Sequence, residues 1–477
     1  MIERLFRVSE RGSTVPRELR GGLVTFMAMA YIIVLNPLIL GSVTPGDPSA
    51  KADALGGILP VAQVAAVTAL VAGVMTILFG LVANYPFAIA TGLGINTLLA
   101  VTIAPMMTWP EAMGLVVIDG LIIVVLAVTG FRTAVFNAVP PELKTAIAVG
   151  IGAFIAMIGL VDSGFVRRLP DAANTTVPVG LGIDGSIASW PTFVFVLGLV
   201  IVGILVARGV RAGMLIGIVV TTIIAIVVEA IAGVGPSAPD RPEGWSLAVP
   251  TLPDQVVGLP DLSLVGQVSF GAFARLDIIT VVLLIFTLVL ANFFDAMGSL
   301  TGLGRQAGLT DSQDKLPDVG KALVVEGTGA VAGGLGSSSS NTLFVESAAG
   351  IAEGARTGLA NVLTGVLFLL AMFFTPLYSI VPVEAAAPAL VVVGALMFRQ
   401  ITTIELDDLR TAIPVFLTVT VMPFTYSIAN GIGAGFVSYV ALSAATGRAR
   451  QVHPLMWVVA VLFVGYFAVG PIRALLG

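Results

Sequence analysis

Residues 329–354 read GAVAGGLGSSSSNTLFVESAAGIAEG, and this stretch decides what kind of membrane protein the chain can form. A run of serines, an asparagine and several glycines interrupt a segment that is otherwise apolar enough for a membrane. Irregular backbone at that depth is tolerated only where protein buries it or where it lines a cavity. Glu346 follows the interruption, and a carboxylate inside a span normally marks a substrate or proton path. The pattern predicts a transporter.

Two more carboxylates lie in stretches that read as membrane spans. Residues 278–304, IITVVLLIFTLVLANFFDAMGSLTGLG, contain Asp295, and Glu326 lies in the next apolar stretch. A charged side chain near the bilayer centre is costly and usually faces a cavity or a polar partner. These residues are therefore functional candidates.

The composition of the whole chain is typical of a polytopic membrane protein. Its 477 residues are 57% hydrophobic and 11% charged, and 54 glycines and 27 prolines favour close helix contacts and broken helices. The absence of cysteine and the single histidine exclude disulfides, thiolate metal sites and histidine clusters. No basic patch with interleaved aromatic residues is present, so we expect no nucleic-acid partner. No nucleophile–base pair, HExxH motif or phosphate loop is present, so we expect neither an enzyme nor a cofactor.

Apolar stretches predict an all-α protein with about fourteen membrane spans. The short stretches 343–354 and 384–398, and a stretch at 453–475 that would make a fifteenth crossing, leave the count open by one. The predicted spans are 21–41, 58–80, 86–103, 111–130, 143–162, 190–207, 212–235, 276–304, 319–336, 343–354, 356–376, 384–398, 411–428, 431–446 and 453–475.

The basic residues predict the orientation. If residues 1–20 are cytoplasmic, most of the 23 Lys and Arg fall in cytoplasmic segments, as the positive-inside rule requires. We therefore expect a multi-pass protein of the cell inner (cytoplasmic) membrane, in contact with lipid, with a cytoplasmic amino terminus. The first twenty residues are charged rather than apolar, so no cleavable signal peptide is visible.

The polar segment 236–269, expected outside, divides the chain into two halves of seven spans. An odd number of spans inverts the second half relative to the first, as in inverted-repeat transporters. The third span of each half is irregular: 83–103 reads ANYPFAIATGLGINTLLAVTI, and its counterpart contains the serine run. In both we expect a short extended strand followed by a half-helix, whose free N–H groups suit an anionic or hydrogen-bond-accepting ligand.

Asp295 and Glu346 are the main candidates for substrate binding and proton coupling. For Asp295 the alternative is a structural hydrogen bond to a neighbouring helix, and Asn292, three residues earlier on the same helical face, is a candidate partner in the site. For Glu346 the alternative is a helix cap. A carboxylate there can accept N–H bonds from a planar heterocycle.

The other predicted binding residues surround these two. Phe344 offers an aromatic face for stacking. Asn96 can donate and accept hydrogen bonds, with helix capping an equally good interpretation. Gly94 allows close backbone approach, and Val345 adjoins Glu346. Behind the site we expect two supporting residues, Glu326 and Ser347.

Several blocks taken together resemble the AzgA-like purine permeases, a branch of the nucleobase–ascorbate transporter superfamily. The resemblance covers nearly the whole chain. Its blocks are TFMAMAYIIVLNPLIL (25–40), ANYPFAIATGLGINTLLA (83–100), FFDAMGSLTGLGRQAGL (293–309), FVESAAGIAEGARTGL (344–359) and MPFTYSIANGIGAGF (422–436).

The resemblance implies a fourteen-helix inverted repeat and proton-coupled uptake of adenine, guanine or hypoxanthine by an elevator-type motion. It implies a core domain (21–130 and 270–376) and a gate domain (141–235 and 382–475) through which two copies form a dimer. Asp295 matches the family's essential acid, Glu346 its ligand-binding acid, and Asn96 and Phe344 its asparagine and stacking aromatic. The family usually has an acid where this chain has Asn292. The alternative function is a related-fold transporter of another planar base, such as uracil or xanthine, or of an anion.

Overall fold

The computed structural model describes residues 2–42, 51–131, 138–168, 179–183, 185–238, 241–253, 255–310, 316–317, 319–378 and 380–476. The predicted linker 236–269 includes 239–240 and 254, which lie outside the described residues. Helices at nearly all the predicted spans confirm the all-α fold. They are α2 (Val15–Met29) with α3 (Ile32–Leu40), α4 (Val61–Val82), α6 (Trp109–Val128), α8 (Pro141–Asp162), α9 (Trp190–Ala207), α10 (Gly213–Ala232), α12 (Ile278–Gln306), α13 (Val319–Leu335), α15 (Gly358–Ala371), α17 (Val383–Phe398), α18 (Leu409–Phe424), α19 (Ile428–Ala445) and α20 (Pro454–Leu476).

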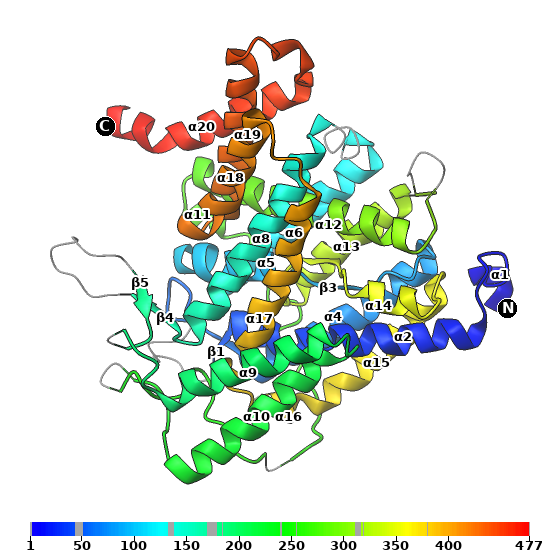
Figure 1. The fold of residues 1–477 in the computed structure, drawn as a ribbon, viewed down its shortest axis with the longest axis vertical. Coiled ribbons are helices and arrows are strands. Elements are labelled where there is room, and N and C mark those ends of the chain that lie inside the picture. Colours follow the sequence, from blue (N-terminus) through cyan, green and yellow to red (C-terminus); the bar gives the residue numbers. More distant parts are fainter. Residues whose placement is uncertain are drawn as a thin grey trace.

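The number of crossings stays a prediction. Among the described residues, nine helices are long and apolar enough to cross a membrane, and four shorter apolar helices accompany them. α18 is one of the shorter helices, and α20 contributes another at Pro454–Ala468. Figure 1 shows the carboxy terminus, at the end of α20, projecting from the side of the bundle.

The third segment of each half has the predicted form of a strand followed by a short helix. β3 (Ile89–Thr91) leads into α5 (Leu93–Leu98), and β6 (Asn341–Leu343) leads into α14 (Ser347–Ala352). The two strands pair antiparallel, with Ala90 opposite Thr342, and both are fully buried. Because equivalent strands of the two halves run in opposite directions, the pairing agrees with an inverted repeat.

The ladder continues beyond the strands and satisfies the buried backbone. Gly92 N donates to Ser340 O at 3.0 Å, and Phe344 N donates to Ala88 O at 3.0 Å. On the outer edge, the Thr76 hydroxyl of α4 bonds both the N–H and the C=O of Ile89. β3 lies near the middle of the view in Figure 1, with helices around it. Irregular backbone is therefore held by protein at the depth where lipid offers no partner.

The helices form two groups by their packing. In the first, α2, α4 and α15 pack together, as do α6, α12 and α13. In the second, α8, α17 and α18 pack together, with α9 and α10 against α17, and α19 against α18. The first group contains both strands of the ladder. Figure 1 shows α9 and α10 side by side at one end of the molecule.

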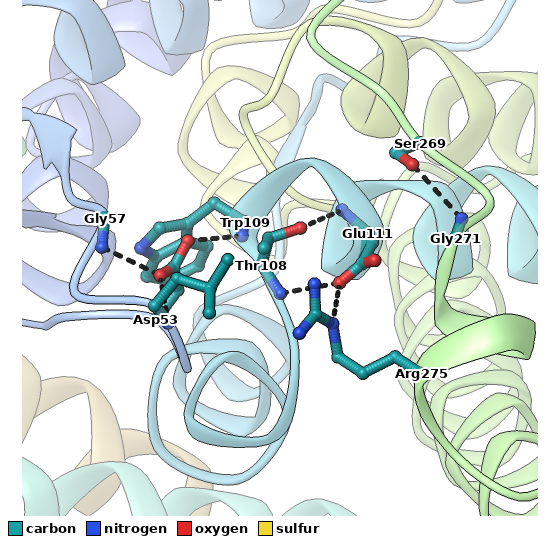
Figure 2. A network of polar contacts seen from close by, with 9 residues as sticks. Asp53, Gly57, Thr108, Trp109, Glu111, Ser269, Gly271 and Arg275 are labelled. Carbon is teal, nitrogen blue, oxygen red and sulfur yellow. Dashed lines mark hydrogen bonds and ion pairs between the residues drawn. The ribbon is translucent and has the colours of Figure 1, made fainter.

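Hydrogen bonds and an ion pair connect the loops at one end of the first group of helices (Figure 2). The Asp53 carboxylate accepts from the N–H groups of Trp109 and Gly57, at 3.0 and 2.8 Å. Thr108 and Glu111 form a capping box at the start of α6. Arg275 of α11 (Ala272–Arg275) donates to Glu111 at 2.7 Å. The loop after β1 (Gly41–Ser42), which pairs with β2 (Leu59–Pro60), is thereby joined to the segment that precedes α12.

Two further strands lie in the second group's loops. β4 (Val166–Arg168) pairs antiparallel with β5 (Val179–Leu181). Two more short α-helices are α1 (Ile2–Phe6) and α16 (Thr375–Tyr378). Short π- or 3-10-helical segments lie at Leu99–Ile103, Ala104–Met106, Met372–Phe374, Arg399–Thr403 and Ala449–Gln451.

Glycines bring α4 and α15 into backbone contact at two levels. A Cβ atom on Gly358 would overlap Gly80 O, and a Cβ atom on Gly365 would lie 2.5 Å from Gly73 O. Helices in lipid associate largely through such close van der Waals packing, because lipid is as apolar as their side chains. These contacts hold α15, which follows the site helix α14, against α4.

We expect Gly80→Ala to destabilise the protein by about 1–3 kcal/mol, because the new methyl group must push two backbones apart. The Cβ atom would overlap Gly358 O. The check is the thermal midpoint of the purified protein in detergent. Gly203→Ala on α9 is the matched control, since nothing lies within 4 Å of its Cβ position. Equal midpoints for the two variants would contradict the prediction.

Candidate functional site

A cavity of about 510 Å³ lies between the two groups of helices. One wall comes from the first group: Tyr31, the ends of β3 and β6, and one face of α12. The opposite wall comes from α8, α10, α17 and α19. A cavity of this volume is in the range of small-molecule binding sites.

The first wall is polar. Asp295 on α12 and Glu346 at the start of α14 both line the cavity, and both are partly exposed. Gly92 lies beside them: a Cβ atom there would be 3.0 Å from the Thr342 side chain and 3.6 Å from Asp295 Oδ2. The absence of a side chain at Gly92 therefore leaves the carboxylate open to the cavity.

Tyr31 fixes the orientation of Glu346. It lies at the break between α2 and α3, is 1% exposed, and donates its hydroxyl hydrogen to Glu346 Oε1. Glu346 precedes α14 as its cap residue but makes no side-chain capping bond, so the capping interpretation is wrong for its side chain. One carboxylate oxygen is held from behind while the residue faces the cavity.

Phe344 and Val345 complete the wall next to Glu346. Phe344 lines the cavity and its ring lies 6.5 Å from that of Tyr31, tilted by 46°. Val345 is 52% exposed and also lines the cavity. Gly94 lines it from the opposite strand–helix segment, where a Cβ atom would lie 3.2 Å from Ile151 of α8. The glycine thus allows the two groups to approach.

The second wall is apolar. The residues that form it are Ile147, Ala148, Ile151, Ile155, Met214, Val393, Leu396, Met397 and Ile428, with Gln400 at its edge. None of the described residues that line the cavity is lysine, arginine or histidine. The cavity therefore combines carboxylates and an aromatic ring on one side with aliphatic side chains on the other.

Four of the predicted residues lie behind the cavity rather than on it. Asn96 is fully buried within α5, so it caps no helix; its Oδ1 accepts from the Thr91 hydroxyl at 2.6 Å. Ser347 is buried and its hydroxyl accepts from Ala88 N at 2.9 Å. Asn292 and Glu326 are buried in α12 and α13. None of these four residues is among the lining residues.

Tyr31 and Asp119 are not among the residues predicted from the sequence. Tyr31 lies in the apolar span 21–41, at the place where the helix breaks between α2 and α3. Asp119 lies in the middle of α6 and is fully buried. The rule that selected Asp295 and Glu346, a carboxylate inside a span, would have selected Asp119 too.

Comparison with known proteins places the chain in a family. Residues 17–434 match Xan_ur_permease, described as Permease family. The guanine/hypoxanthine permease PbuG of Bacillus subtilis (strain 168) is 38% identical over 98% of this chain and 99% of that protein. The adenine permease AdeP of Escherichia coli (strain K12) is 34% identical over 97% of this chain and 95% of that protein.

Solved structures of anion transporters share the fold at low identity. The transmembrane domain of a cyanobacterium bicarbonate transporter, BicA, is 14% identical with a TM-score of 0.61, over 88% of this chain and 96% of that chain. The murine anion transporter Slc26a9 is 11% identical with a TM-score of 0.57, over 90% of this chain and 68% of that one.

The family model and the named relatives show that the chain belongs to the Permease family, in the branch of AzgA-like purine permeases that its sequence blocks resemble, and that it is a transporter rather than an enzyme.

Proposed function

We propose that this protein takes up purine nucleobases across the cytoplasmic membrane with the proton gradient as its energy source. The observation that carries the proposal is the cavity in which Glu346 and Asp295 share a wall with Phe344. Relatives whose names specify guanine, hypoxanthine and adenine support the substrate class.

The polar wall has the chemistry that a purine requires. A purine base is planar and presents N–H donors on its edge, which a carboxylate accepts with short, directional bonds. Glu346 is the primary acceptor, because the hydrogen bond from Tyr31 to Oε1 fixes the orientation of its carboxylate. The base would bond to the other oxygen. Phe344 stacks on the ring face. Asn96, Asn292, Glu326 and Ser347 hold this wall in place from behind.

The same wall argues against an anion as substrate. The lining residues include two carboxylates, and none of those described is basic. An anion would meet negative charge without a compensating cation in a poorly solvated site, which is unfavourable. The likeness to bicarbonate and other anion transporters therefore supports the fold and not their substrates. Uracil or xanthine would suit the wall better than an anion would.

Accumulation of a neutral base against its gradient needs a coupling ion. Asp295 and Glu346 are titratable groups on the cavity wall, where a proton can enter with the substrate. Asp295 lies on the same wall as Glu346 but on a separate helix, α12, so we assign it the proton and assign Glu346 mainly the base. No metal or organic cofactor is part of this proposal.

The two walls suggest how the site reaches both sides of the membrane. We propose that a core (21–130 and 270–376) slides as an elevator against a gate (141–235 and 382–475), joined by the linker 236–269. The aliphatic gate wall offers no directional bonds that a sliding core must break. Ion pairs do join the core and the gate: Glu353, after α14, pairs with Arg211 between α9 and α10, and Lys51 pairs with Asp162 at the end of α8 at 3.3 Å. Both pairs would open during the movement.

The remaining parts of the proposal concern the membrane. The amino terminus is cytoplasmic and the protein lies in the inner membrane in contact with lipid. Exposed apolar side chains on the gate helices, including Val200, Ile204, Val219 and Ile223, suit lipid or a second copy of the chain. We propose a homodimer through the gate.

Glu346→Gln should abolish or reduce purine uptake by at least about a hundredfold, because the amide loses the charged acceptor for the base and for Tyr31. The measurement is accumulation of radiolabelled guanine, hypoxanthine and adenine in cells that lack their own purine permeases. Glu405→Gln, an exposed loop residue, is the control for loss of one carboxylate. Uptake by the Glu346 variant at the wild-type rate would exclude Glu346 from the site.

Tyr31→Phe removes the hydroxyl that holds Glu346 while keeping the ring. We expect the KM for the base to rise about tenfold, because the carboxylate loses one charge-assisted hydrogen bond and its fixed orientation. Initial uptake rates over a range of base concentrations give the KM, and western blotting gives the amount of protein. An unchanged KM would show that Tyr31 does not orient the acceptor.

Asp295→Asn should separate transport from the proton gradient, because the amide cannot take up and release a proton. We expect the variant to equilibrate the base across the membrane without concentrating it. The measurement compares the accumulation ratio of the base at external pH 5.5 and 7.5, with and without a protonophore. Accumulation that a protonophore still collapses, as in wild type, would remove Asp295 as the coupling group.

A further inference from the structure

Asp119 is a buried carboxylate that the proposed transport cycle does not use. It lies near the midpoint of α6, with no exposed surface. α6 packs against α12 and α13, the helices that carry Asp295 and Glu326. The next residue, Gly120, allows α13 to come close: a Cβ atom there would lie 2.5 Å from Val331 N. A charged group so deep in a span is retained only for a structural or functional reason.

Asn292 connects Asp119 to the irregular segment before β6. Its amide nitrogen Nδ2 donates to Asp119 Oδ2 at 3.0 Å and to the Ser340 hydroxyl oxygen at 2.9 Å. A side-chain amide nitrogen has two hydrogens, so these two bonds use both. The amide oxygen Oδ1 is buried and has no hydrogen-bond partner among the described residues.

The same connection reaches the cavity. The backbone carbonyl oxygen of Ser340 accepts the hydrogen bond from Gly92 N at 3.0 Å, and Gly92 lines the cavity next to Asp295. Asn292 lies one helical turn before Asp295 on α12. A change in the orientation of the Asn292 amide would therefore alter the hydrogen bonds of both half-helix segments and the position of Asp295.

We propose that Asp119 is a positioning residue of the transport site: it orients the Asn292 amide, which holds Ser340, and the backbone of Ser340 in turn holds Gly92 at the cavity wall. This inference rests on the proposed function only for its effect on uptake. An ionised carboxylate can only accept, so the amide must turn its nitrogen toward Asp119 and its oxygen away. If position 119 held a neutral side chain that can also donate, the Asn292 amide could rotate and exchange the positions of its nitrogen and oxygen.

Among the described residues, the helices α11, α12 and α13 pack against α6 and carry its titratable neighbours. On α12 and α13 the interior titratable residues are Asp295 and Glu326, whereas Asp277, Arg305 and Lys321 lie at or near the helix ends. On α11, Arg275 pairs with Glu111 at the start of α6. Asn292 therefore stands between the carboxylate on α6 and the site on α12.

Exchange of the two side chains tests the pairing directly. Asn292→Asp places two carboxylates about one hydrogen bond apart, so they must share a proton or repel. We expect its thermal midpoint in detergent to equal that of wild type at pH 5.5 and to fall below it at pH 8. The double variant Asp119→Asn with Asn292→Asp restores one carboxylate and one amide, and its midpoint should return to the wild-type value at both pH values.

Purine uptake should also fall in a single variant and recover in the double variant. Asp119→Asn frees the amide and should lower purine uptake about tenfold, the loss of one charge-assisted hydrogen bond. The double variant should recover at least half of wild-type uptake and its pH profile, which a residue that only fills space would not do. Asn430→Asp is the control, because its side-chain oxygen accepts a hydrogen bond from the Tyr466 hydroxyl and no hydrogen bond to a carboxylate is found among the described residues. Adding Asp119→Asn to this control should not improve its uptake at pH 8.

The outcomes separate this inference from the proposed function. A double variant no better than the single variants, or wild-type uptake by Asp119→Asn, would overturn the role of Asp119 while leaving purine transport intact. A wild-type chain that takes up no purine would overturn the proposed function. The thermal midpoints need no substrate, so they would still confirm or overturn the pairing of Asp119 with Asn292.

Discussion

The structure depends on backbones that approach one another without side chains between them. Glycines bring α4 against α15, α6 against α13, and the start of α14 against α2, where a Cβ atom on Gly350 would overlap Thr25. In lipid the helices gain no hydrophobic driving force from association, so this close packing is the main source of cohesion. It makes the first group of helices a compact support for the ladder and for the polar side chains beside it.

Much of this architecture could be predicted from the sequence because the membrane allows few kinds of structure. Long apolar runs must be helices, and a polar interruption such as 337–341 must be buried by protein. These two rules gave nearly every helix and both strand–half-helix segments. The carboxylates were found in the same way, and Glu346 and Asp295 do line a cavity. The count of crossings was beyond these rules, because helix length alone does not decide it for α18 and α20.

Contacts between distant segments could not be predicted. Nothing local to Tyr31 says that its hydroxyl meets Glu346, and nothing local to Asn292 says that it meets Asp119. The aliphatic wall carries no sequence signal either, since Ile151 and Met397 look like any lipid-facing residue. Asn96 was expected to cap a helix or touch the ligand, but it turns inward to Thr91 because α5 begins before it.

The ladder between β3 and β6 also sets an order of events during synthesis. Its strands belong to opposite halves of the chain, so the backbone of Ile89–Thr91 has no ladder partner until Asn341–Leu343 has left the ribosome. At ordinary translation rates that delay is about 10–50 s. During this interval the first half must either keep the segment out of the lipid or shield it with other protein. The assembled site is thus a late product of biogenesis, and half of the chain cannot form it alone.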